Sequence, residues 1–153
     1  MPQILFVCSA NRYRSVIAVA CFNDELIRRK LESKWSVSSA GTWTRDGLPP
    51  MKEAVLQADL LGLDIHEHRS RAITGELLQT ADLVLVMESG QKEALQIEFS
   101  RNRKKIMLLS EAAEGRAYDI SDPIADPSTV GTASQICGLI RLGFDNICDL
   151  ARR

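Results

Sequence analysis

The sequence predicts an α/β fold in which a four-stranded parallel sheet is flanked by helices, and three observations support this. Short apolar runs rich in β-branched residues alternate with longer stretches of helical character, which is typical of a doubly wound sheet. Residues 83–86 are apolar at successive positions, as in a strand covered on both faces. A chain of 153 residues, with 45% hydrophobic and 25% charged residues, can bury one sizeable core. We therefore expect a single domain over residues 1–153.

Strands and helices are expected in alternation along the chain. The apolar, β-branched runs predict strands at residues 4–7, 35–38, 83–87 and 105–109. Helices are predicted at residues 15–32, 50–61, 89–99 and 132–150. In the last of these, Thr132 and Gln135 have the spacing of a capping box, and Ile136, Ile140 and Phe144 recur at helical spacing. This helix is expected to pack one apolar face on the core.

The charge and the hydrophobic pattern of the sequence indicate which cellular compartment and which classes of binding partner to expect. The formal net charge is -1, so no global basic field is available to attract nucleic acid or an acidic membrane. The N-terminus lacks a basic, apolar leader, and no apolar stretch approaches the ~20 residues that cross a bilayer. We therefore expect a cytoplasmic protein whose four cysteines stay mostly reduced. Cys21, Cys137 and Cys148 are expected to fill the core.

The segment after the first predicted strand carries the residue types of phosphoryl chemistry. It reads Cys8-Ser9-Ala10-Asn11-Arg12-Tyr13-Arg14-Ser15 and leads into a helix that should begin at about Arg14 or Ser15. A loop entering a helix N-terminus aims backbone N–H groups and the positive end of the helix dipole at one point, so residues 9–15 are predicted to bind phosphate. The same field stabilises a thiolate, which makes Cys8 a candidate nucleophile. The planar fork of Arg14 can hold two phosphate oxygens, and the Ser15 hydroxyl can donate to the thiolate.

The pattern Cys-x5-Arg-Ser directly after an N-terminal strand resembles the low-molecular-weight protein tyrosine phosphatase family. Three further segments resemble the family in the same order along the chain: Ser39-Ala40-Gly41-Thr42, the stretch from Gly62 to His68-Arg69-Ser70-Arg71, and Asp122-Pro123. The resemblance implies a flavodoxin-like fold of the phosphotyrosine protein phosphatase I type. It also implies hydrolysis of phosphate monoesters, with phosphotyrosine on proteins as the expected substrate, without a cofactor.

The resemblance also implies roles for single residues. Cys8 would form a cysteinyl phosphate, Arg14 would clamp the phosphate, and Asp122 would protonate the leaving oxygen and then activate water. Asp126, which is also followed by proline, remains a rival for the acid. Small phosphate esters are alternative substrates, and the protein is expected to be a monomer or a weak homodimer. The residues that match the family's hydrogen-bond network around the phosphate loop are Asn11, Ser39 and His68.

The chain departs from the family pattern around the predicted site. Ala10 stands where the family has glycine, and Tyr13 replaces a second cysteine that can trap an oxidised nucleophile as a disulfide. Ile124 follows the Asp-Pro pair where the family commonly has an aromatic residue, so the preference for phosphotyrosine is less certain. Trp43 can supply an alternative wall of the substrate cleft. Arg12 adds positive charge at the mouth and can bias substrate choice.

Two other functions stay open at this point. Arsenate reduction occurs on a related scaffold, but it needs nearby thiols to relay a disulfide, and residues 81–96 contain none. A module that binds phosphate or phosphoproteins without turnover could retain the loop after losing catalysis. No metal is expected, because His66 and His68 alone are too sparse for a metal site.

Overall fold

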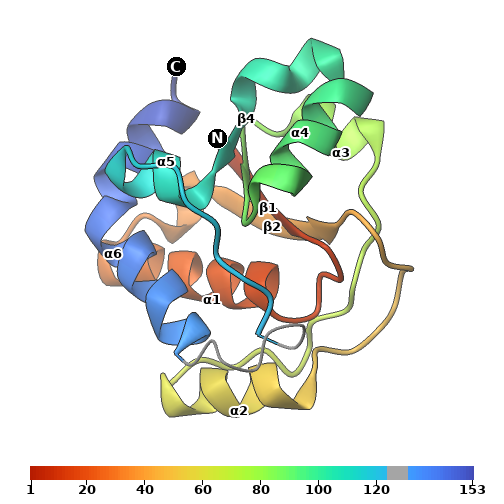
Figure 1. The fold of residues 1–153 in the computed structure, drawn as a ribbon. Helices are drawn as coiled ribbons and strands as arrows, with labels where there is room; N and C mark the ends of the chain where they lie inside the picture. The colour runs from red at the N-terminus through yellow and green to blue at the C-terminus, as the bar shows by residue number, and fades with distance from the viewer. Residues whose placement is uncertain (124–130) are drawn as a thin grey trace.

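The computed structural model describes residues 1–123 and 131–153, and its centre is a four-stranded parallel sheet with the order β2-β1-β3-β4 (Figure 1). The strands are β1 Gln3–Cys8, β2 Ser36–Gly41, β3 Leu83–Val86 and β4 Ile106–Leu108. Ile4 of β1 pairs with Val37 on one side and with Leu83 on the other. The predicted fold class is confirmed, with strand ends shifted by a few residues, most of all in β2.

The helices also follow the prediction, with additions. The predicted helices are α1 Arg14–Arg28, α2 Lys52–Leu60, α4 Ser89–Glu98 and α6 Thr132–Ala151. The sequence analysis missed the short helices α3 Gly75–Thr80 and α5 Leu109–Glu114, and the 3₁₀ turns η1 Glu32–Lys34 and η2 Ser100–Lys105. One or two helical turns are too short for periodicity to be read from a sequence. Helix α1 ends before the predicted position, because Lys30 adopts a left-handed φ of 58°.

The helices form a layer on each face of the sheet (Figure 1). Successive residues of a strand point to opposite faces, so Phe6 of β1 packs with α1, α5 and α6, whereas Leu5 packs with α3 and α4. On the first face, Phe22 of α1 stacks on Phe144 of α6 with ring centroids 4.9 Å apart. This double cover explains why β3 is apolar at every position. Among the described residues, no helix combines the length and apolar character needed to span a membrane.

The capping box predicted for Thr132 and Gln135 at the start of α6 is wrong. Gly131 takes the N-cap position with a φ of 76°, a left-handed conformation that glycine adopts without strain. Thr132 is therefore the first helical residue and is buried, and no side chain caps the helix. The backbone N–H of Gln135 donates to the carbonyl of Gly131 at 2.8 Å.

The cysteines outside the predicted phosphate loop are buried, as expected, but two of them are not free. Cys21 of α1 and Cys137 of α6 form a disulfide, with Cα atoms 5.4 Å apart. The expectation of four reduced thiols is therefore wrong for this pair, because α1 and α6 pack side by side and bring together residues 116 positions apart. Cys148 is a free thiol, and burial raises its pKa to about 11.

The contact between α5 and α6 generates a stability prediction. Gly143 of α6 lies so close to α5 that a Cβ atom added there would overlap the backbone of Ala113. Gly143→Ala should lower the free energy of unfolding by about 1–3 kcal/mol through overpacking. The matched control is Gly138→Ala on the same helix, where no atom lies within 4 Å of the added Cβ. That variant should gain up to about 1 kcal/mol of helix propensity. Urea unfolding of both variants checks the contrast, and equal effects would contradict this packing.

Candidate active site

The residues from Cys8 to Ser15 form a loop that leaves the carboxyl end of β1 and enters α1 at Arg14. Cys8, the last residue of β1, is buried, and its Sγ lies 3.1 Å from the Ser15 hydroxyl. Alanine would be strained here only if its φ were positive. Ala10 does not adopt a positive φ, so its replacement of the family's glycine causes no such strain. The loop thus brings the Cys8 sulfur to the N-terminus of a 15-residue helix, where backbone N–H groups have no helical partner.

Asn11 holds the loop in shape from its centre. It is fully buried and has a φ of 56°, a left-handed conformation that asparagine tolerates better than most residues. Its Nδ2 donates to Ser15 Oγ at 2.8 Å and to Ser39 Oγ at 2.9 Å. Its Oδ1 accepts from the backbone N–H of Arg71 at 2.9 Å. The ring Nε2 of His68 donates to the Asn11 carbonyl at 2.7 Å, so His68 joins the same network.

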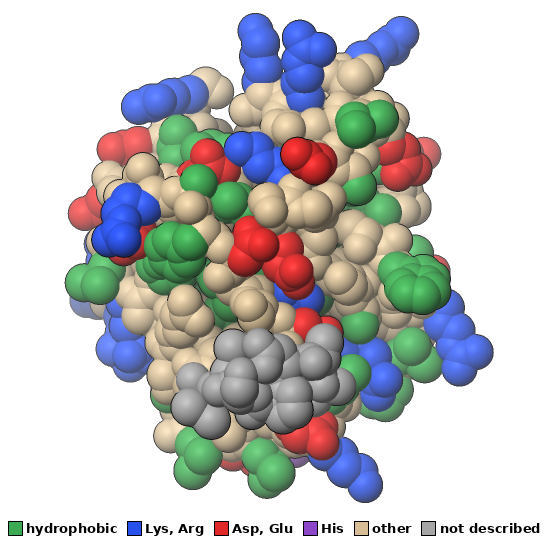
Figure 2. Space-filling view, in the orientation of Figure 1, with side chains coloured by type: hydrophobic (Ala, Val, Ile, Leu, Met, Phe, Trp, Pro, Cys, Tyr) green, Lys and Arg blue, Asp and Glu red, His purple; other side chains and the backbone are tan. Residues whose placement is uncertain are grey.

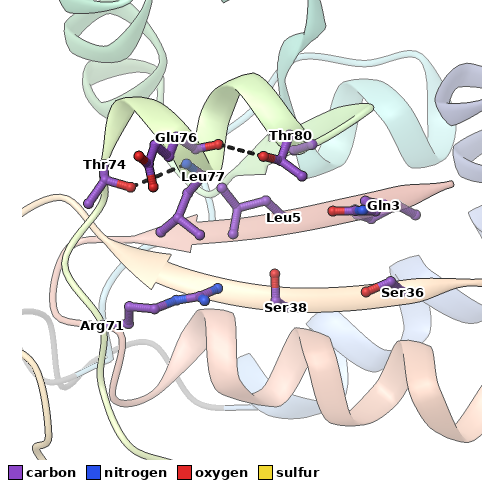
Figure 3. Close-up of a pocket in the computed structure, with 11 residues that line it drawn as sticks. Gln3, Leu5, Ser36, Ser38, Arg71, Thr74, Glu76, Leu77 and Thr80 are labelled. Carbon is purple, nitrogen blue, oxygen red and sulfur yellow. Dashed lines mark hydrogen bonds between the residues drawn. The ribbon is translucent and has the colours of Figure 1, made fainter.

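Arg71 connects this network to β2 and lines a separate pocket. Its guanidinium donates to the Ser39 carbonyl from Nε at 3.3 Å and from Nη2 at 3.2 Å. Figure 3 shows the side chain reaching along β2 toward Ser38, in a pocket of ≈350 Å³ between the sheet and α3. None of the residues from Cys8 to Ser15 lines this pocket. It is therefore not the site in which Cys8 could react.

Arg14 lies buried beneath the loop, among acceptors from two other segments. Its Nη1 forms an ion pair with Glu88, two residues after the end of β3, and donates to the Ile120 carbonyl at 2.7 Å. Its Nη2 is 4.0 Å from an Asp122 carboxylate oxygen. Sequence reasoning missed Glu88. The signal was present, because an acid directly after a strand lies at the same carboxyl edge of the sheet as Cys8.

Gln91 is a second site residue that sequence reasoning missed. Its Oε1 accepts from the backbone N–H groups of Met87 at 3.1 Å and Glu88 at 3.0 Å, at the start of α4. Its Nε2 donates to Ser9 Oγ at 3.0 Å, across 82 positions of the chain. A single buried amide thus ties the phosphate loop to the segment that holds Arg14. No local motif marks such a long-range bond in a sequence.

Other predicted residues lie beside the loop or within it, and the backbone N–H of Trp43 donates to the Ser9 carbonyl at 2.9 Å. Trp43 is 90% exposed, so its ring is free to serve as a wall. Arg12 is half-buried, and its Nε donates to the Pro49 carbonyl at 2.7 Å. Tyr13 is buried, and burial raises its pKa. The Asp122 side chain is 36% exposed. Both Ile124 and Asp126 lie outside the described residues.

Neither histidine takes part in a cluster that could bind a metal. Among residues 1–123 and 131–153, no group of three His, Cys, Asp or Glu side chains is arranged to hold an ion. His66 instead pairs with Asp64 at 2.8 Å, and this hydrogen bond raises the pKa of His66. Burial lowers the pKa of His68.

The opposite pKa shifts of the two histidines predict opposite effects on stability. An unfolded histidine titrates at about pH 6.5. The stability that neutral His68 contributes is complete above that value and is lost as the pH falls toward its lower folded-state pKa. The stability from protonated His66 is complete below about 6.5 and is lost as the pH rises through its higher folded-state pKa.

Urea unfolding between about pH 5 and 8, a range that brackets the pKa of an unfolded histidine, tests these signs. Relative to wild type, His68→Asn should lose less stability on acidification, and His66→Asn should lose more. An unchanged acid dependence in His68→Asn would contradict the assignment of a neutral, buried ring.

Comparisons with known proteins agree with this geometry. The family model of low molecular weight phosphotyrosine protein phosphatase matches residues 3–149. The "Probable low molecular weight protein-tyrosine-phosphatase EpsP" of Ralstonia nicotianae is 39% identical over 123 residues, covering 80% of this chain and 79% of that protein. A protein-arginine-phosphatase of Bacillus subtilis is 33% identical over 124 residues, covering 79% of each chain. The low molecular weight protein tyrosine phosphatase structure from T. tengcongensis has a TM-score of 0.84 at 32% identity, covering 97% of this chain and 99% of its own.

The match therefore includes both the loop that presents Cys8 and the sheet that supports it. Because the family pattern extends from residue 3 to residue 149 and the fold is shared over nearly the whole chain, this protein belongs to the low molecular weight phosphotyrosine protein phosphatase family.

Proposed function

We propose that this phosphatase hydrolyses phosphate monoesters through a phosphorylated Cys8, with Arg14 as the phosphate clamp and Asp122 as the acid and base. The observation that supports the proposal is that Cys8 and Arg14 stand at the two ends of one loop before a helix, with Asp122 beside Arg14. The Cys8 sulfur ends β1, the Arg14 guanidinium opens α1, and the Asp122 carboxylate lies 4.0 Å from that guanidinium. These groups are a nucleophile, an anion clamp and a proton donor, which this reaction requires.

In the first step, the Cys8 thiolate attacks phosphorus. A sulfur–phosphorus bond forms while the bond from phosphorus to the ester oxygen breaks, and Asp122 gives its proton to the departing oxygen. The Ser15 hydroxyl, 3.1 Å from the sulfur, can donate a hydrogen bond to the thiolate. The backbone N–H groups of the loop and the α1 dipole favour the negative phosphoryl group at this position.

Arg14 is suited to hold the phosphoryl group because one side of its guanidinium is already fixed. Its Nη1 is occupied by Glu88 and the Ile120 carbonyl, which orients the plane of the fork. The Nε group and the Nη2 group, which lies 4.0 Å from Asp122, can donate to two phosphoryl oxygens, a bidentate geometry that lysine cannot offer. Prior orientation lowers the entropy lost when substrate binds.

In the second step, water attacks the cysteinyl phosphate. Asp122, now a carboxylate, removes a proton from that water, the sulfur–phosphorus bond breaks, and Cys8 returns as the thiolate. Orthophosphate leaves. The partial exposure of the Asp122 side chain is compatible with contact to both a leaving group and a water molecule.

Among phosphoproteins, we propose phosphotyrosine rather than phosphoarginine as the preferred substrate. Relatives with either activity in their names match this chain, so the residues at the mouth must decide. The exposed ring of Trp43 can pack against a phenyl ring in an offset or edge contact. The positive charge of Arg12 would repel the guanidinium group of a phosphoarginine substrate. The same charge would attract acidic residues that flank a phosphotyrosine.

The cysteines favour hydrolysis over a thiol relay. Cys21 and Cys137 are joined to each other, and Cys148 is a buried thiol whose pKa is raised to about 11. A thiol with so little thiolate at neutral pH exchanges disulfides poorly. Arsenate-dependent oxidation of thioredoxin, measured beside phosphate release, tests the relay directly.

The catalytic roles predict distinct losses for two variants. Cys8→Ser should abolish p-nitrophenyl phosphate hydrolysis, since the alkoxide of serine is far less accessible than a thiolate. Asp122→Ala should lower kcat/KM, which reports the first step, by ~10²–10⁴-fold for esters with poor leaving groups, and by less for p-nitrophenyl phosphate, whose leaving group needs little protonation. Asp126→Ala serves as the matched control and should behave as wild type. If purified wild type released no phosphate, the proposal would fail; turnover by Cys8→Ser would remove Cys8 from its role.

The charge at the mouth predicts a shift in substrate preference. Arg12→Ala should lower kcat/KM for acid-flanked phosphotyrosine peptides relative to phosphoarginine peptides by about two- to fivefold, as expected from one exposed charge pair. Competition assays with the two peptide classes measure this ratio. Lys52→Ala, an exposed cation at the start of α2, is the control. A ratio that did not move, or moved toward phosphotyrosine, would exclude Arg12 as a discriminating residue.

A further inference from the structure

A cluster of cations that form no ion pair with the described residues lies on η2, outside the candidate active site. Arg101, Arg103 and Lys104 are exposed and, together with Ser100, line a hollow of ≈430 Å³. Figure 2 shows these charges as a group of Lys and Arg side chains projecting at the top of the view, above the position of η2 in Figure 1. In a protein with a formal net charge of -1, this is a local concentration of positive charge. We call it the η2 hollow.

The backbone of η2 is held in place by neighbours that leave these three cations free. Gln96 Nε2 donates to the Arg103 carbonyl at 3.0 Å. Lys105 Nζ donates to the Ala81 carbonyl at 2.6 Å and to the Gln79 carbonyl at 3.2 Å, at the end of α3. None of the ion pairs among residues 1–123 and 131–153 includes Arg101, Arg103 or Lys104. In the described part of the chain, the backbone of η2 is thus held by hydrogen bonds while its three exposed cations form no ion pair.

Helix α4 sets the separation between this hollow and the candidate active site. The helix starts next to Glu88, the partner of Arg14, and its ten residues end at Glu98, just before η2. At ~1.5 Å per residue, α4 is about 15 Å long, so the hollow lies roughly 15–25 Å from the phosphate loop. An extended peptide, at ~3.3 Å per residue, covers that separation with about five to eight residues.

We propose that the η2 hollow docks an acid-rich segment of phosphoprotein substrates, displaced by about five to eight residues from the phosphorylated side chain. This inference rests on the proposed phosphatase function. Two arginine forks match carboxylates in pairs, and a second contact on the same chain raises the effective concentration of the first. A membrane is a poorer fit, since three cations give weak attachment without a lipid anchor. Nucleic acid is also a poorer fit, because the hollow has no aromatic side chain on which bases could stack.

Steady-state kinetics with paired peptides tests the docking. Each peptide carries one phosphotyrosine and, about eight residues away on either side, four glutamates or four glutamines. For the wild type, the glutamate peptide should have the lower KM. In the double variant Arg101→Glu/Lys104→Glu, its KM should rise by about five- to tenfold to the value of the glutamine peptide, while kcat is unchanged. Hydrolysis of p-nitrophenyl phosphate, which is too small to reach η2, should also be unchanged.

A charge-matched double variant is the control. Lys34→Glu/Arg116→Glu changes the net charge equally at exposed positions outside the hollow, and should leave the KM of both peptides unchanged. An equal rise of KM in this control would reduce the effect to general charge and overturn the docking site. So would equal KM values of the two peptides for wild type. Binding of wild type, but not of Arg101→Glu/Lys104→Glu, to phosphatidylserine vesicles or single-stranded DNA, without a peptide effect, would assign the hollow to those partners instead. If wild type did not hydrolyse p-nitrophenyl phosphate, the proposed function itself would be contradicted. The peptide results above contradict the docking site while hydrolysis of p-nitrophenyl phosphate is retained.

Discussion

The buried guanidinium of Arg14 is the group around which the candidate site is arranged. A charge removed from water is costly unless it is paired and hydrogen-bonded, and here the partners come from segments far apart in the chain. Glu88 follows β3, the Ile120 carbonyl lies beyond α5, and Asp122 lies two residues further on. The pairing thus links the start of α1, the segment after β3 and the segment that contains Ile120 and Asp122.

The second constraint is the conformation of the loop itself. A left-handed φ at Asn11 costs free energy unless surrounding contacts compensate, and they are supplied by Ser15, Ser39, His68 and the backbone of Arg71. These partners lie on α1, on β2 and in the segment after α2, so the parallel pairing of β1 with β2 is needed to assemble them. The fold therefore contributes to the chemistry by fixing the loop.

Much of this could be predicted from the sequence, and the failures have physical causes. Strands buried on both faces and a Cys-x5-Arg-Ser loop are local patterns, so the sheet and the Cys8 loop were predictable. Gln91 acts through a hydrogen bond to a residue 82 positions away, which no local pattern reveals. Glu88 pairs with a residue 74 positions away, and only its place after a predicted strand could have indicated it. The Cys21–Cys137 disulfide also depends on how two distant helices pack. At the start of α6, Gly131 has a positive φ and is itself the N-cap. The capping box that the spacing of Thr132 and Gln135 suggested therefore does not form.

The central claim is that Cys8 carries the phosphoryl group between the two steps, with Asp122 serving both. Rapid quenching of Asp122→Ala with p-nitrophenyl phosphate, followed by mass spectrometry of the acid-quenched peptides, tests it most directly. A good leaving group departs with little help from the acid, whereas water attack lacks its base, so a phosphorylated Cys8 peptide should accumulate. A burst of p-nitrophenol equal to the enzyme concentration should accompany it. Steady turnover with no phosphorylated peptide, or phosphate on any residue other than Cys8, would contradict the account.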